Sequence, residues 1–296
     1  MTNYINCTAH HASDGNLLVG EAHTAMIDCG MAFCADETIK KVKNALNDRP
    51  LDYIFFSHTH YDHIGALPFF KKEWPQARVV TSAPGAAVLL KDTPRRVIRE
   101  MSIIAAKANG STLDTPYSDD VFHADIIVEE GSAIDLGGLT VQVIETPGHT
   151  RDSLSFLMPE LEILALSETL GVLMPDGSVH PCYLTSFADT ISAIKKCSQL
   201  PHKHLSLPHQ GLISSKKADG FFEKALAANI ACWDFIIGMK QQGLDEEEML
   251  ALFFQKYGSD VLFSYQPREA FMLNSRATIS CTLQGYLQNS RYNQEG

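Results

Sequence analysis

The chain has 296 residues, of which 45% are hydrophobic and 20% charged, as in soluble globular proteins. Its formal net charge of -11 argues against extended binding to nucleic acid, whose phosphates would repel it. The seven cysteines are scattered without a Cys-x-x-Cys pair, so neither a disulfide framework nor a thiolate metal site is indicated, and we expect a cytoplasmic protein. The sequence shows neither a basic leader nor an apolar run of about 20 residues, so we predict no membrane segment.

Short β-type segments alternate with helical ones over the first 210 residues. The predicted strands are bounded by Gly, Pro or Asp and cover residues 22–29, 52–57, 78–82, 125–128, 139–146, 153–158, 163–166 and 204–207. Apolar residues at spacings of three and four predict helices over residues 36–46, 84–108 and 187–200. This order of elements indicates a mixed α/β fold.

The pattern becomes entirely helical after Gly211. Helices are predicted over residues 218–242, 245–257 and 267–287, and Asp245 is the expected N-cap of the second. No Gly/Ser-rich linker separates this part from the rest. We therefore expect an α/β catalytic domain of residues 1–213 and a helical extension of residues 214–296 packed on it.

The most specific motif is the run from His58 to His63, which reads His-Thr-His-Tyr-Asp-His directly after a predicted strand. A His-x-His-x-Asp-His pattern occurs by chance in about one chain per thousand of this composition. Because alternate side chains of an extended segment point the same way, His58 and His60 can bind one ion. Asp62 and His63 then face a second position.

Three further candidate ligands follow predicted strands in the same way, namely His149, Glu168 and His209. The repeated order of apolar strand, tight turn and ligand predicts that these segments converge on one edge of a sheet. His180, Cys182 and Tyr183 lie in a later loop containing Pro and Gly, and they are candidates for lining a substrate pocket. No Gly-rich phosphate loop is present.

These motifs resemble those of the metallo-β-lactamase fold superfamily of dinuclear metallohydrolases, over residues 15–213. The resemblance implies an αββα sandwich and two divalent metal ions, Zn, Fe or Mn. It also implies that Asp28 orients a ligand histidine. By the same resemblance the first metal is held by His58, His60 and His149, the second by Asp62, His63 and His209, and Glu168 takes the place of the usual bridging Asp.

The segment after Gly211 resembles the helical extension of the branch that includes the thioesterase-like quinolone-signal response protein of pseudomonads. This resemblance implies a helical cap that covers the active-site cleft and restricts access to the metals.

The inferred reaction is hydrolysis of an ester, thioester or similar acyl bond in a small organic substrate by a metal-bound hydroxide, with phosphodiesters as the second substrate class. Asp62 is the candidate catalytic residue, which would orient the water and handle its proton. Two alternatives remain open: an iron-dependent oxidoreductase of the same fold, and a non-catalytic protein that binds a small molecule in signalling. We expect no nucleic-acid or membrane partner, and the oligomeric state, a homodimer included, is open.

Overall fold

The computed structural model describes residues 3–113 and 117–292. Contacts between residues divide the chain into two compact units. Unit 1 contains residues 1–145, 152–167 and 201–215, and unit 2 contains residues 146–151, 168–200 and 216–296. The chain therefore passes between the units several times, and a domain boundary between residues 213 and 214 stays a prediction.

Unit 1 contains two six-stranded sheets. The first has the order β1 (Tyr4–Asn6), β2 (Asn16–Val19), β3 (Thr24–Ile27), β4 (Tyr53–Phe55), β5 (Arg78–Ser82) and β6 (Ile126–Val128). Strands β1 to β3 pair antiparallel, whereas β3 to β6 pair parallel. Because the carboxyl ends of parallel strands lie at one edge of a sheet, the segments that follow β3 and β4 begin side by side.

The second sheet has the order β14 (Gly211–Leu212), β13 (His204–Leu207), β10 (Ile163–Ala165), β9 (Leu154–Met158), β8 (Thr140–Glu145) and β7 (Ala133–Asp135). Only the β10–β13 pair is parallel among these strands. Apolar side chains from both sheets form one buried cluster, in which the rings of Phe55 and Phe156 lie 5.5 Å apart. The predicted strands are confirmed, and they build a sheet-on-sheet core.

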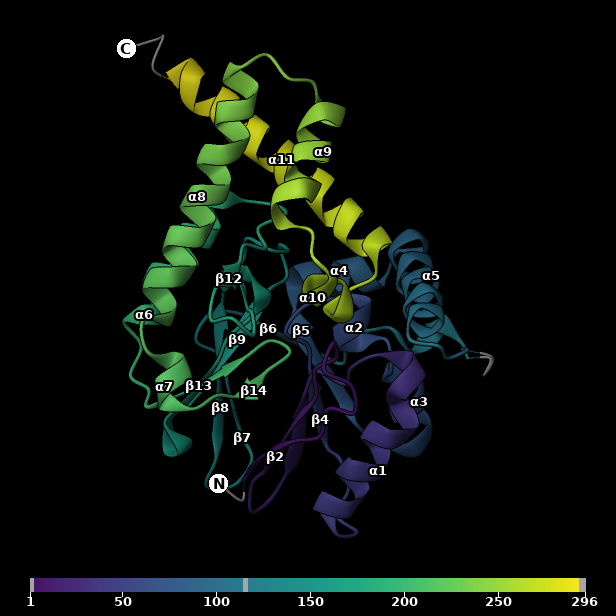
Figure 1. Ribbon diagram of the computed structural model, residues 1–296. Coiled ribbons are helices and arrows are strands. Elements are labelled where there is room, and N and C mark those ends of the chain that lie inside the picture. The colour runs from purple at the N-terminus through teal and green to yellow at the C-terminus, as the bar shows by residue number, and fades with distance from the viewer. Residues whose placement is uncertain (1–2, 114–116, 293–296) are drawn as a thin grey trace. The chain divides into compact units, whose positions relative to one another are not determined.

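The helices of unit 1 are α1 (Ala35–Leu46), α2 (Tyr61–Ile64), α3 (Leu67–Glu73), α4 (Ala83–Leu89) and α5 (Asp92–Ala108), drawn in purple to blue in Figure 1. The single helix predicted over residues 84–108 is wrong, because Lys91 has an extended backbone between α4 and α5. Pro94 lies in the first turn of α5. Backbone N–H groups in the first turn have no acceptor within the helix, so a proline there costs no helical hydrogen bond. Asp62 and His63 lie in α2 and not in an extended loop.

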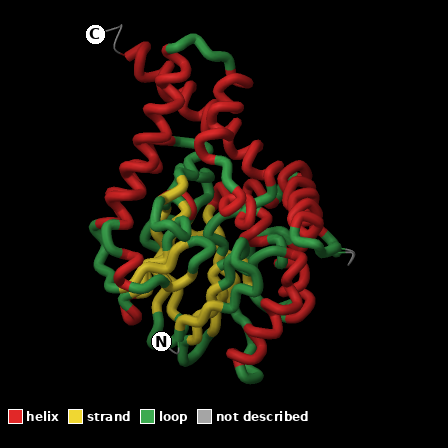
Figure 2. Tube along the Cα trace, in the orientation of Figure 1, coloured by secondary structure: helices red, strands yellow, loops and turns green. Residues whose placement is uncertain are grey.

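Unit 2 is mainly helical, as Figure 2 shows in red. Its elements are β11 (Val172–Leu173), β12 (Val179–His180), α6 (Phe187–Ser198), α8 (Phe221–Gln241), α9 (Glu246–Tyr257), α10 (Asp260–Tyr265) and α11 (Arg268–Tyr292), with α7 (Ser215–Ala218) at its edge. Helix α11 packs against α8 and α9 around a cluster that includes Cys232, Phe253 and Phe271. The helices predicted after Gly211 are confirmed. Within the described ranges, no helix has the length and apolar character needed to cross a membrane.

Helix α9 begins with a capping box. Asp245 accepts a hydrogen bond from the Glu248 N–H at 2.9 Å, and the Glu248 carboxylate accepts one from the Asp245 N–H at 2.9 Å. We expect Asp245→Ala to lower the free energy of unfolding by about 1 kcal/mol, because the cap is lost. Urea denaturation measures this change. The neighbouring Glu246→Ala variant is the control, and equal stability of the two variants would contradict the assigned cap.

Candidate metal centre

The segment after β4 brings two histidines together in unit 1. Its backbone is fixed on both sides, because Phe56 donates to the Val80 carbonyl at 2.9 Å and Leu154 donates to the Ser57 carbonyl at 2.7 Å. The rings of His58 and His60 then lie 4.6 Å apart, and their ring nitrogens lie within 4.8 Å of one another. The two side chains that the sequence assigns to one ion therefore lie beside each other.

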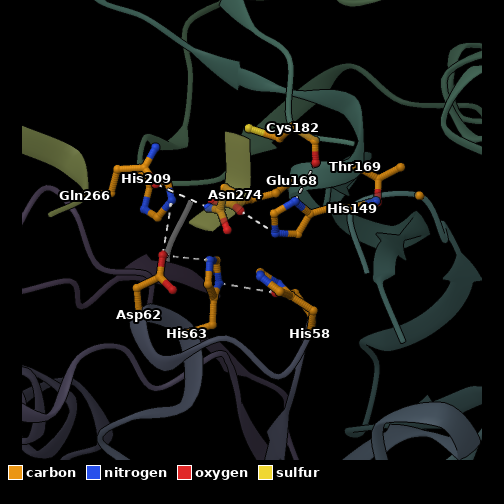
Figure 3. Close-up of polar contacts among 12 residues, drawn as sticks. His58, Asp62, His63, His149, Glu168, Thr169, Cys182, His209, Gln266 and Asn274 are labelled. Atoms are coloured by element: carbon orange, nitrogen blue, oxygen red, sulfur yellow. Dashed lines mark hydrogen bonds and ion pairs between the residues drawn. The ribbon is translucent and has the colours of Figure 1, made fainter. Parts of the chain in front are cut away.

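A second group of unit 1 consists of Asp62, His63 and His209. Helix α2 supplies the first two, and His209 follows β13. Asp62 Oδ2 lies 3.6 Å from His63 Nε2 and 3.8 Å from His209 Nε2, as the dashed lines in Figure 3 mark. Two imidazole nitrogens therefore face one carboxylate oxygen.

Asp28 orients His63. It follows β3, and its Oδ2 lies 2.8 Å from His63 Nδ1. The same carboxylate accepts from the Ser57 hydroxyl at 2.7 Å and from the Ser57 N–H at 2.8 Å. A carboxylate at Nδ1 favours the proton on that nitrogen, which leaves the Nε2 lone pair available toward Asp62.

A second buried carboxylate, Asp14, was not identified from the sequence. Its Oδ2 accepts a hydrogen bond from the His209 N–H at 2.8 Å, and it lies 3.8 Å from His209 Nδ1 and 3.9 Å from His63 Nδ1. Burial raises the pKa of Asp14 to about 6, although the nearby imidazoles of His209 and His63 act in the opposite direction. Asp14 lies in the segment Ser13-Asp14-Gly15, which has no spacing relation to the ligand motifs.

Unit 2 contains the other two predicted ligands, which lie next to each other. His149 Nε2 lies 2.9 Å from Glu168 Oε2, and His149 Nδ1 lies 2.6 Å from the Cys182 carbonyl oxygen (Figure 3). The His149 N–H donates to Thr169 Oγ1 at 3.1 Å, and the Thr169 hydroxyl donates to the Thr146 carbonyl at 2.6 Å. His149 is thus fixed like His63, with Nδ1 at an acceptor and Nε2 toward a carboxylate.

The loop after Glu168 makes contacts that the sequence did not reveal. Cys182 contacts His149 through its backbone carbonyl. His180 packs against the rings of Tyr257 and Phe271, at 5.8 and 6.3 Å, and burial lowers the pKa of its imidazole to about 4. A role for His180, Cys182 and Tyr183 in lining a substrate pocket stays a prediction.

Comparison with known families shows to which superfamily the chain belongs. Residues 13–209 match the family model described as the metallo-beta-lactamase superfamily. The chain belongs to the metallo-β-lactamase superfamily. The αββα fold class predicted from the sequence is thereby confirmed, with a helical segment after the matched region.

One relative is similar to this chain in both sequence and structure. The metallo-β-lactamase fold-containing protein ST1585 of Sulfurisphaera tokodaii is 27% identical over 223 residues, which are 71% of this chain and 77% of that protein. Its solved structure matches with a TM-score of 0.58 over 93% of both chains, at 22% identity, which shows the shared fold.

Two further relatives have named activities. A hydroxyacylglutathione hydrolase of Rhodopseudomonas palustris is 31% identical over 147 residues, 50% of this chain. A nitric oxide reductase of Moorella thermoacetica is 26% identical over 202 residues, 67% of this chain. The matched segment covers 43% of the length of each of these two proteins.

The donor sets of this metallo-β-lactamase superfamily member fit a divalent cation. All the ligand atoms are imidazole nitrogens and carboxylate oxygens, which suit zinc, iron and manganese alike. In His63 and His149 the Nδ1 atom is already at an acceptor, so Nε2 is the nitrogen that faces an acidic partner. Superfamily membership together with these clusters indicates a divalent metal site.

Proposed function

We propose that this protein is a metal-dependent hydrolase that cleaves an ester, thioester or similar acyl bond in a small organic substrate. The observation that carries the proposal is the block from His58 to His63, in which imidazole nitrogens and the Asp62 carboxylate gather at the end of β4 while Asp28 anchors His63. Membership of a superfamily that contains hydroxyacylglutathione hydrolases supports the same reaction class.

In this proposal seven residues would hold two cations. His58, His60 and His149 would bind the first, Asp62, His63 and His209 would bind the second, and Glu168 would supply a carboxylate beside them. Chain connectivity supports joining the residues of the two units, because His149 lies in the connection from β8 to β9 and Glu168 comes three residues after β10. Bound cations would supply Lewis-acid activation of water and of the substrate carbonyl.

Glu168 differs from the aspartate that we expect at this position of the superfamily. Its additional methylene moves the carboxylate by about 1.5 Å, one C–C bond. Its Oε2 nevertheless lies 2.9 Å from His149 Nε2, so the longer side chain still reaches its neighbouring ligand. This contact supports a role for Glu168 as a ligand.

Asp62 is the residue that we assign to proton handling. Its Oδ2 lies within 3.8 Å of Nε2 of both His63 and His209, where a carboxylate can hold a water and take its proton. Asp28 has a different role in this scheme, which is to fix the His63 tautomer.

The test is metal removal combined with a substrate panel. The purified protein is analysed for zinc, iron and manganese and assayed on aryl esters, thioesters, lactones and bis-phosphodiesters. We expect hydrolysis of an acyl substrate that falls to background after chelation and returns on adding back the metal. Hydrolysis that persists in metal-free protein would contradict the proposal.

The two alternative functions give different results in the same experiment. Absorbance changes on anaerobic reduction, with no hydrolysis, would indicate the oxidoreductase that the nitric oxide reductase relative suggests. A fully metallated protein that is inert on the whole panel but stabilised by a small molecule would indicate a binding protein. Either result would overturn the hydrolase proposal.

A further inference from the structure

His209 occupies an unfavourable backbone conformation. Its φ is +61°, in the left-handed region where a side chain with a Cβ is strained. The compensating contact comes from a residue 195 positions earlier, because the His209 N–H donates to Asp14 Oδ2 at 2.8 Å. This long-range hydrogen bond fixes the strained peptide that carries the candidate ligand.

Asp14 is itself held firmly in unit 1. On one side, the Met31 N–H donates to the Ser13 hydroxyl at 2.9 Å, and on the other, the Cys7 N–H donates to the Gly15 carbonyl at 2.9 Å. The Asp14 side chain is 6% exposed. Its carboxylate is therefore preorganised and does not need to be recruited when a cation binds.

The Asp14 carboxylate contacts His209 more closely than it contacts His63. Asp28 already contacts His63 Nδ1 at 2.8 Å, whereas Asp14 Oδ2 lies 3.9 Å from that atom. Toward His209, Asp14 has both the 2.8 Å bond to the peptide N–H and a 3.8 Å approach to Nδ1. The longer distances exceed hydrogen-bond length, but a buried charge at this range still acts strongly on an imidazole.

We propose that Asp14 is a positioning residue for His209, holding its strained peptide and turning its imidazole so that Nε2 faces Asp62 and the second cation. This inference rests on the proposed metal centre and adds to it a residue outside the predicted ligand motifs. Asp14 would act for His209 as Asp28 acts for His63, so each of these two histidines has its own buried carboxylate.

The experiment compares metal binding in the wild type, Asp14→Ala and Asp14→Asn. Zinc content per chain is measured after dialysis, and each zinc affinity is measured by competition with a chromogenic chelator. We expect two zinc ions in the wild type, and in Asp14→Ala an affinity for one of them that is about 10- to 100-fold weaker, the usual effect of losing such a partner. Asp14→Asn should lie between, because its amide oxygen can still accept from the His209 N–H.

Asp52 provides a matched control in the same unit. Its carboxylate also accepts from a backbone N–H, that of Thr24 at 2.9 Å, and lies 3.5 Å from an imidazole, that of His23. Asp52→Ala should leave both zinc affinities unchanged. A purely structural role for Asp14 would weaken both metals equally, so selective loss of one is the diagnostic result.

The possible failures are distinguishable. If the wild type binds no metal, the proposed centre and the role of Asp14 both fail. If the wild type binds two ions and Asp14→Ala retains both at wild-type affinity, the centre stands and the positioning role is overturned. Should circular dichroism show that Asp14→Ala is unfolded, Asp14→Asn decides, and wild-type affinity for both ions in that folded variant overturns the inference.

Discussion

Replacing His60 with alanine is expected to lower the hydrolytic rate by at least about 10³-fold. In the proposed centre His60 is a ligand of the first cation, and activation by a bound metal contributes several kcal/mol to the reaction, of which about 4 kcal/mol corresponds to 10³-fold. The measurement is kcat/KM on the best substrate of the panel, together with metal content per chain. We expect the metal content to fall in parallel.

The fold should tolerate this change. His60 is the N-cap of α2, but its side chain makes no capping hydrogen bond, and the carbonyl that accepts from His63 and Ile64 is retained in alanine. His123→Ala is the matched control, because His123 also lies beside a carboxylate, with Nε2 3.4 Å from Asp125. Full activity in the His60 variant, or equal losses in both variants, would refute the assignment.

The candidate ligands could be recognised in the sequence because they are encoded locally. The pattern from His58 to His63 combines residue type with fixed spacing, and His149, Glu168 and His209 each follow an apolar strand that could be recognised. The same apolar runs predicted the central strands, because their side chains are buried in the sheet-on-sheet core. Both signals need only a few consecutive residues.

What the sequence did not reveal depends on contacts between distant segments. Asp14 contacts a residue 195 positions away, and nothing in its own segment of the sequence marks it. The acceptor for His149 Nδ1 is the backbone carbonyl of Cys182, and every residue has such a carbonyl. Short elements such as β1 and α2 were also missed, since three or four residues show too little periodicity.

Gly148 fixes the position of His149, and Gly148→Ala is expected to disrupt the centre without removing a ligand atom. Its φ is +143°, which side chains with a Cβ rarely adopt, and an added Cβ would overlap Thr190 Oγ1 and lie 2.8 Å from Thr169 Cγ2. The loop has little freedom to move away, because the Gly148 carbonyl accepts from the N–H groups of Leu184 and Thr185 at 3.0 and 2.9 Å.

We expect Gly148→Ala to lower the free energy of unfolding by about 3 kcal/mol, combining backbone strain with overpacking. Urea denaturation measures the loss of stability, and metal analysis measures the disruption of the centre. Gly177→Ala separates the causes, because Gly177 in the same unit also has a positive φ, +83°, but an added Cβ there meets nothing within 4 Å. The control should lose about 1 kcal/mol from strain alone and keep its metals. If Gly148→Ala binds metal as tightly as Gly177→Ala does, the close packing of residues 146–151 is not what holds His149 in place.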